Sequence, residues 1–229
     1  MIAKYLIMSS LKNVKFIPLA NNNYLNYSIM QRFYNIVSIV FVPLLIPTYG
    51  FLLIVNMDVF SMLPFVWKAY TVGGTIFFTL ILPLIPIAMM IKKGSVSTVM
   101  ISKKEERTVP YLFTFFGYCC WVFFIWRSLQ LPPFFLAMAV ACTSSILIVT
   151  LINLKWKISA HMSAMGGLLG GIIGVSLRMG MNPAWLIGLV IFFSGLVGLA
   201  RLELKAHNPL QVVAGFFLSF MLVLFSCFY

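Results

Sequence analysis

The sequence predicts an all-α, polytopic transmembrane bundle of six or seven helices, and three observations support this fold class. The 229 residues are 62% hydrophobic and only 9% charged, whereas roughly a quarter of the residues of a soluble domain are charged. Lipid must therefore cover much of the protein, and a chain crosses lipid only as helices or as a closed barrel. The apolar runs are much longer than the roughly ten residues of a barrel strand and do not alternate, so helices are predicted.

Seven apolar segments are long enough to be considered as membrane spans. They cover roughly residues 33–55, 69–91, 110–127, 131–154, 160–178, 183–200 and 209–228. Residues 1–32 differ because lysines and a run of asparagines interrupt their apolar residues, so we expect an interfacial or disordered tail. The transmembrane domain is therefore expected at 33–229, in a multi-pass protein that, if its source is bacterial, would lie in the cell (inner) membrane.

The basic residues are divided unevenly between the two ends of the predicted spans. The chain carries sixteen Lys and Arg against four acidic residues. With seven spans, thirteen of the sixteen fall on one side, and only Lys68, Arg127 and Arg178 fall on the other. This bias predicts that the first side is cytoplasmic, although a basic active site would produce the same bias. In a membrane protein such a charge indicates contact with anionic lipids as partners, and we expect no nucleic acid.

Three polar clusters fall on the more basic side, within residues 103–110, 157–161 and 201–211, and they include both histidines of the chain. Polar residues near a bilayer usually have a function. Arginine side chains suit phosphate oxygens, and a serine at a helix start adds a hydroxyl beside backbone N–H groups. A neutral histidine can attack phosphorus while a second one protonates the leaving alkoxide. The clusters therefore predict phosphoryl transfer through a phosphohistidine.

We expect no metal and no other cofactor in this chemistry. The chain has one aspartate, and its histidines and carboxylates do not form a metal-binding pattern. All four cysteines lie inside apolar runs without metal-type spacing, so we interpret them as packing residues.

The layout of the clusters resembles the type 2 phosphatidic acid phosphatase and vanadium haloperoxidase superfamily. That superfamily has a basic first motif ending in Arg-Pro, then Pro-Ser-Gly-His, then Ser-Arg-x5-His-x3-Asp. The third motif is matched by Ala200-Arg201-x5-His207-x3-Gln211 and the second by Ile158-Ser159-Ala160-His161, with two predicted spans between them. The first motif is matched only loosely, by Lys103, Lys104, Arg107 and Pro110.

The resemblance implies a role for each matched residue. His207 would be the nucleophile and His161 the general acid. The phosphate would be held by Arg201 and Ser159, with Arg107 and one of Lys103 or Lys104 as helpers. The substrate implied by the resemblance, and by a site at the membrane interface, is a lipid phosphate or pyrophosphate.

One departure from the superfamily pattern bears directly on activity. Gln211 stands where the superfamily has an aspartate that orients the nucleophilic histidine. Its amide oxygen can fix the tautomer of His207 one helical turn away, but it offers no negative charge to the imidazolium that attack creates. In a serine-protease triad, the equivalent Asp-to-Asn change lowers turnover by roughly 10⁴. The segment from Asn208 to Gln211 also reads as a capped helix start, with Asn208 as the N-cap.

Two alternatives to a phosphatase remain open at the level of sequence. The first is a non-catalytic relative that binds a lipid phosphate without hydrolysing it, which Gln211 favours. The second is a small transporter or structural membrane protein in which the motifs are coincidental. Five glycines of the 160–178 span lie on a small-residue face, and we interpret them as sites of close helix packing rather than as a phosphate loop.

Overall fold

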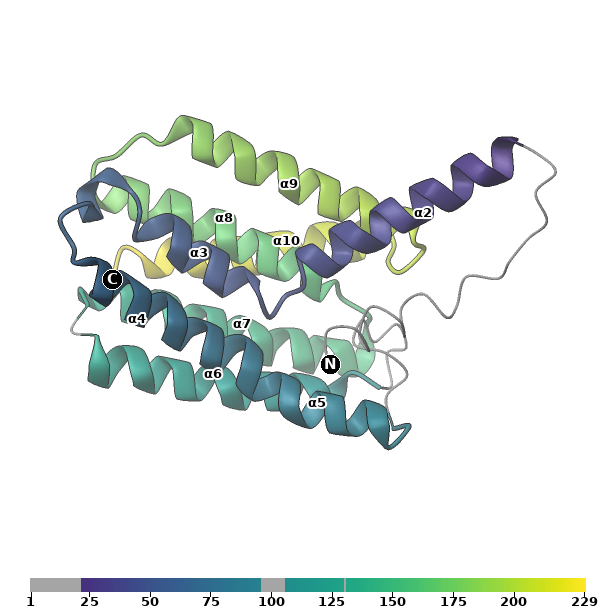
Figure 1. Cartoon of the computed structure of the whole chain (residues 1–229), viewed down its shortest axis with the longest axis horizontal. Coiled ribbons are helices and arrows are strands. Elements are labelled where there is room, and N and C mark those ends of the chain that lie inside the picture. The colour runs from purple at the N-terminus through teal and green to yellow at the C-terminus, as the bar shows by residue number, and fades with distance from the viewer. Residues whose placement is uncertain (1–21, 96–105, 130) are drawn as a thin grey trace.

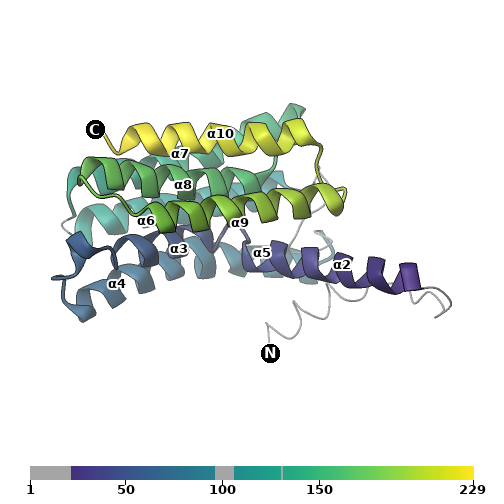
Figure 2. The same ribbon diagram turned by 90° about the horizontal axis from the view of Figure 1, so that it is seen from above.

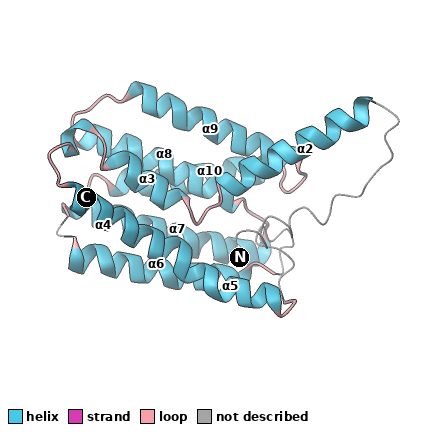
Figure 3. Cartoon of the chain, in the orientation of Figure 1, coloured by secondary structure: helices cyan, strands magenta, loops and turns pink. Residues whose placement is uncertain are grey.

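The computed structural model describes residues 22–95, 106–129 and 131–229. Within these ranges the regular elements are helices and no strand occurs, which confirms the predicted all-α fold (Figure 3). The helices in chain order are α2 (Asn22–Val40), α3 (Ile46–Ile54), η1 (Asp58–Phe60), α4 (Phe65–Ile76), η2 (Phe77–Ile81), α5 (Leu82–Lys92), α6 (Thr108–Ser128), α7 (Pro133–Lys155), α8 (Ala160–Arg178), α9 (Ala184–Glu203) and α10 (Pro209–Ser226).

Six helices of the described chain are long and apolar enough to cross a membrane, which supports an integral membrane protein. They are Phe65–Lys92, Thr108–Ser128, Pro133–Lys155, Ala160–Arg178, Ala184–Glu203 and Pro209–Ser226. Each corresponds to one predicted span, and α8 has the predicted bounds. In the first of the six, the π-helical segment η2 joins α4 to α5 without interrupting the helix.

The segment predicted as a first span, 33–55, is not one continuous helix. It is divided between α2 and α3, and the break falls at Pro43, which has no N–H to donate to the preceding turn. Pro47 lies at the start of α3, where a missing N–H costs nothing. Helix α2 also begins at Asn22, inside the predicted tail, and extends beyond the end of the bundle (Figure 1).

Helix α8 lies at the centre of the bundle. In the apolar window of α8, 78% of the residues are buried, against 22–44% in the other five spans. It packs most extensively on α10, because glycines bring the two backbones together. A Cβ added at Gly166 would lie 2.0 Å from the carbonyl oxygen of Phe216, and one at Gly170 would lie 2.5 Å from that of Phe220. This contact confirms the predicted close packing for Gly166 and Gly170.

The described parts of the predicted basic clusters gather at one end of the bundle. The spans alternate in direction, so the end of α7 and the start of α8 lie beside the end of α9 and the start of α10 (Figures 1 and 2). The start of α6, which follows Arg107, lies at the same end. The assignment of this end to the cytoplasm stays a prediction, and Lys103 and Lys104 lie outside the described residues.

Candidate functional site

The turn between α9 and α10 places His207 against the last turn of α9. After Glu203 the chain reverses at Lys205, whose φ of 50° is in the left-handed region. The carbonyl oxygen of Arg201 accepts hydrogen bonds from the backbone N–H groups of Ala206, at 3.1 Å, and His207, at 3.3 Å. Such bonds close the C-terminal end of a helix, and here they hold His207 near Arg201.

Gln211 contacts His207 and also caps α10. Asn208 accepts a hydrogen bond from the backbone N–H of Gln211 at 2.9 Å, and Gln211 Oε1 accepts one from the backbone N–H of Asn208 at 3.2 Å. This reciprocal pair is the capping box that the sequence predicted. The same Oε1 atom lies 3.1 Å from Nδ1 of His207. The two roles considered for Gln211 are therefore filled at once.

The contact with Gln211 fixes the tautomer of His207. An amide oxygen only accepts hydrogen bonds, so neutral His207 donates from Nδ1 and leaves Nε2 unprotonated. Burial, together with the charges of Arg107 and Arg201, lowers the pKa of His207 to about 3, while the hydrogen bond that His207 donates to Gln211 opposes this shift. His207 is therefore neutral near pH 7, which is the form that can act as a nucleophile.

The second histidine has its own backbone partner. His161 lies in the first turn of α8, and its Nε2 is 3.1 Å from the carbonyl oxygen of Ser38 in α2. Because a carbonyl only accepts, neutral His161 donates from Nε2 and carries an unprotonated Nδ1. A proton donated to a leaving group would therefore have to come from Nδ1 of a protonated ring, or else Nε2 would have to give up its bond to Ser38.

Arg201 is an arginine buried in the bundle with part of its hydrogen-bonding capacity unused. Its side chain is only 3% exposed, and Nη1 donates to the hydroxyl of Ser38 at 3.2 Å. Its Nε has no hydrogen-bond partner, and no carboxylate of the described residues pairs with it. A buried, open N–H on a charged group is costly, so the position is suited to an anion that completes it.

A second buried arginine, Arg107, lies just before α6. Its Nη1 donates to the carbonyl oxygen of Ile158 at 3.5 Å, and it is hydrogen-bonded to the hydroxyl of Tyr111. Its charge, like that of Arg201, acts on His207. Two cations thus flank one imidazole at the basic end of the bundle.

Ser159 has a structural role in this arrangement. It is the N-cap of α8: its hydroxyl accepts from the backbone N–H of Met162 at 3.4 Å. Its own N–H donates to the carbonyl oxygen of Gln211 at 3.3 Å, which ties the start of α8 to the start of α10. Ser159 is fully buried and does not line the cavity that the arginines and histidines share.

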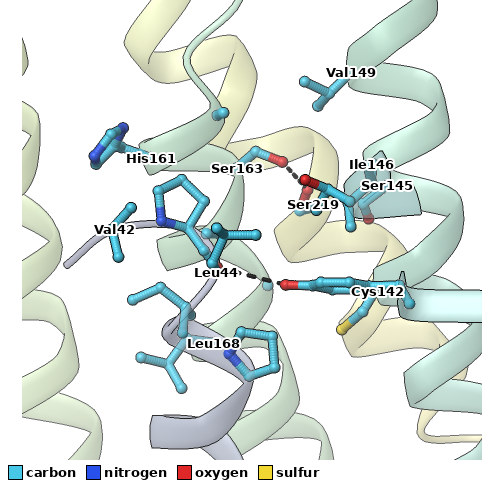
Figure 4. A pocket seen from close by; sticks show the side chains of 18 of the residues that line it. Val42, Leu44, Cys142, Ser145, Ile146, Val149, His161, Ser163, Leu168 and Ser219 are labelled. Atoms are coloured by element: carbon cyan, nitrogen blue, oxygen red, sulfur yellow. Dashed lines mark hydrogen bonds between the residues drawn. The ribbon is translucent and has the colours of Figure 1, made fainter. Parts of the chain in front are cut away.

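These arginines and histidines line one end of a long cavity. Of the residues predicted for the site, the cavity is lined by Arg107, His161, Arg201 and His207. From there it runs between α3, α6, α7, α8 and α10, and it encloses about 1350 Å³ of empty space, counting the part that is open. Figure 4 shows Val42, Leu44 and Leu168 on one side of it and Cys142, Ser145 and Ile146 on the other.

Sequence reasoning missed two features of the site, Ser38 and the apolar cavity. Ser38 is fully buried and contacts both His161 and Arg201, yet it stands alone in an apolar run that offers no signal for such a role.

Among the described residues no group of three or more His, Cys, Asp or Glu is placed to hold a metal ion.

Comparison of the chain with protein-family models, with curated proteins and with solved structures gave no match.

Proposed function

We propose that this protein is a membrane phosphatase that hydrolyses a lipid phosphate or pyrophosphate through a phosphohistidine on His207. The observation that carries the proposal is the open, buried Nε of Arg201 in the same cavity as a neutral histidine whose Nε2 is unprotonated. An anion in this space would meet Arg201 and Arg107 together. The apolar continuation of the cavity suits the hydrocarbon part of a lipid.

The chemistry follows from the tautomer of His207. With the phosphate held by the two arginines, Nε2 attacks phosphorus and the P–O bond to the lipid breaks. The departing oxygen takes a proton from a protonated His161 or from water. Water then attacks the phosphohistidine, releases phosphate and returns His207 to its neutral form. Gln211 keeps the Nδ1 proton in place through both steps, but it cannot neutralise the positive charge that the ring acquires.

A non-catalytic lipid-phosphate-binding protein is the second candidate. It is favoured by the neutral amide of Gln211 and by the bond that holds the Nε2 proton of His161 on Ser38. Binding needs only the arginines and the cavity, and these are the same in both candidates.

The two candidates are separated by hydrolysis and binding assays on purified protein in lipid nanodiscs. Phosphate release from phosphatidic acid and from a prenyl pyrophosphate is measured in EDTA, and an acid-labile phosphoenzyme is trapped with radiolabelled substrate. We expect release and a phosphoenzyme in the wild type and neither in His207→Gln, although that variant should still bind lipid phosphate.

Two other results would reject the phosphatase. Binding without any turnover in the wild type, weakened by Arg201→Ala, would replace the phosphatase by the binding protein. Neither turnover nor binding would reject both and leave a transporter or structural protein.

A further inference from the structure

The cavity is about as long as half the thickness of a bilayer core. Along α6 its lining runs from Arg107 to Trp121, which is about 21 Å at a rise of 1.5 Å per residue. Along α8 it runs from His161 to Gly171, which is about 15 Å. The hydrocarbon core of a bilayer is about 30 Å thick, so the cavity is about as deep as one leaflet.

The few hydroxyl groups inside the cavity are already paired within the protein. Ser163 and Ser219 are 2.5 Å apart, with a hydrogen bond between their hydroxyls (Figure 4). Thr114 donates to a backbone carbonyl of its own helix at 2.9 Å, and Ser145 does the same at 2.9 Å. The hydroxyl of Tyr118 lies 3.5 Å from the carbonyl oxygen of Pro43. An occupant of this part of the cavity is therefore not required to be polar, and a hydrocarbon suits it.

The deep end of the cavity is lined by two aromatic rings that contact each other. Trp121 is 1% exposed, and its indole N–H donates to the hydroxyl of Thr75 at 3.1 Å. The ring of Phe51, 2% exposed, packs edge-on against it with 5.5 Å between ring centroids. We take these two rings as the floor of the cavity. Because both are held by packing, a longer occupant would not easily displace them.

Small residues of α8 leave the space open along its length. Ala164, Gly167 and Gly171 line the cavity at about 5, 9 and 15 Å below His161. A Cβ added at Gly167 would be in ordinary contact, 3.6 Å from Cγ2 of Val223. One added at Gly171 would lie 3.2 Å from the flexible Sδ of Met138. A larger side chain therefore fits at Cβ at position 167, and at position 171 once the flexible side chain of Met138 shifts by a few tenths of an ångström. Because both positions line the cavity, we expect the remaining atoms to occupy it.

We propose that the ligand is a lipid phosphate that inserts a single hydrocarbon chain into this cavity, and that Ala164, Gly167 and Gly171 set the depth available to the chain. The inference rests on the proposed function for the binding of the head group, which the open Nε of Arg201 anchors at the polar end. The floor at Trp121 and Phe51 then limits the chain to about one leaflet in length.

The test is a graded series of cavity-filling variants. Straight-chain alkyl phosphates from butyl to hexadecyl are offered to the purified protein in nanodiscs. Binding, expressed per mole of membrane-partitioned ligand, is followed by the rise in the unfolding temperature, and phosphate release is measured in parallel. Ala164→Leu, Gly167→Leu and Gly171→Leu are compared with Gly188→Leu and Gly195→Leu, whose added Cβ atoms would meet nothing within 4 Å on α9.

We expect the longest chain that binds to shorten in the order of depth. Ala164→Leu should exclude all but the shortest chains, Gly167→Leu the intermediate and long ones, and Gly171→Leu only the longest, each by at least about tenfold. Butyl phosphate should bind all three variants as it binds the wild type, which also shows that they fold. The two α9 variants should keep the wild-type limit.

Other outcomes overturn one proposal or the other. An unchanged length limit in all three variants, or an equal loss of butyl and hexadecyl phosphate, would contradict the chain cavity. Length-dependent binding without phosphate release would contradict hydrolysis and leave the chain cavity standing.

Discussion

Nδ1 of His207 and Oε1 of Gln211 are 3.1 Å apart, and that oxygen also accepts the backbone N–H of Asn208. The side chain of Gln211 has the length required for both contacts. A carboxylate of the same length would keep the geometry and place a negative charge beside the imidazolium of the proposed phosphohistidine.

Gln211→Glu is therefore expected to raise turnover by about 10–100-fold, a partial recovery of the roughly 10⁴ that a triad loses without its carboxylate. Gln211→Asp should gain less, because its shorter side chain reaches neither His207 nor the N-cap as well. Rates of phosphate release under saturating substrate measure the effect.

Asn208→Ala is the matched control for this change. It removes the N-cap, at a cost of about 1 kcal/mol, and leaves the side chain of Gln211 in place. It should lower stability without raising turnover. A folded Gln211→Glu protein with wild-type turnover would contradict the role assigned to the charge.

Stability should fall as the solution is acidified below pH 6.5. The pKa of His207 is lowered to about 3 in the folded protein, whereas the unfolded chain has the ordinary value of about 6.5. Between these values the unfolded state binds a proton that the folded state does not, so the folded state loses up to about 1.4 kcal/mol per pH unit. The unfolding temperature between pH 7 and pH 5 measures this loss.

His207→Gln keeps a polar side chain but cannot titrate, so its unfolding temperature should depend less steeply on pH over the same interval. An identical slope in the wild type and the variant would show that His207 does not contribute. Bound phosphate should flatten the wild-type profile, because an anion beside His207 offsets the two arginines.

Arg201→Lys should weaken lipid-phosphate binding by about 10–100-fold although the charge is retained. A lysine cannot present the planar set of N–H donors of a guanidinium, and each charge-assisted hydrogen bond contributes about 1.5–3 kcal/mol. Dissociation constants for a short-chain lipid phosphate measure the effect. Arg127→Lys is the control, because Arg127 is exposed beyond the other end of the cavity and lies over the ring of Trp126. Equal affinity in the wild type and Arg201→Lys would contradict a role for the guanidinium group of Arg201 beyond its charge.

Gly166→Ala and Gly170→Ala should each destabilise the bundle by about 1–3 kcal/mol or more. The added Cβ would overlap the backbone of α10, which cannot move as a side chain can. Gly188→Ala, on the exposed face of α9, should leave the unfolding temperature unchanged or raise it slightly. Unfolding of the purified variants in one detergent makes the comparison, and equal stability of all three would contradict the close α8–α10 contact.

The helical spans could be predicted because the length of each apolar run and the residues at its ends indicate the same helix bounds. Helix α8 begins after the N-cap Ser159 and ends before Gly180, whose φ is 66°, so its bounds follow from the sequence. The break at Pro43 could not be predicted in the same way. Pro86 lies inside α5 without interrupting it, so a proline in an apolar run does not by itself show where a helix ends.

The candidate site was only partly accessible to sequence reasoning. Spacing grouped Arg201 with His207, but no pattern marks Ser38. A hydroxyl in an apolar helix usually bonds to its own backbone, as Thr71 and Thr75 do here. The division of the glycine face also needed the structure, because Gly166 packs against the backbone of α10 and Gly167 lines the cavity.

The position of Ser38 has a consequence for the assembly of the protein in the cell. Its carbonyl and hydroxyl oxygens contact His161 on α8 and Arg201 on α9, so the first described helix contributes to a site whose two histidines and Arg201 follow more than a hundred residues later. Translation delivers α2 to the membrane well before these partners exist. The proposed anion site is therefore completed only when α8 and α9 have been inserted, and a chain interrupted before them would lack both partners of Ser38.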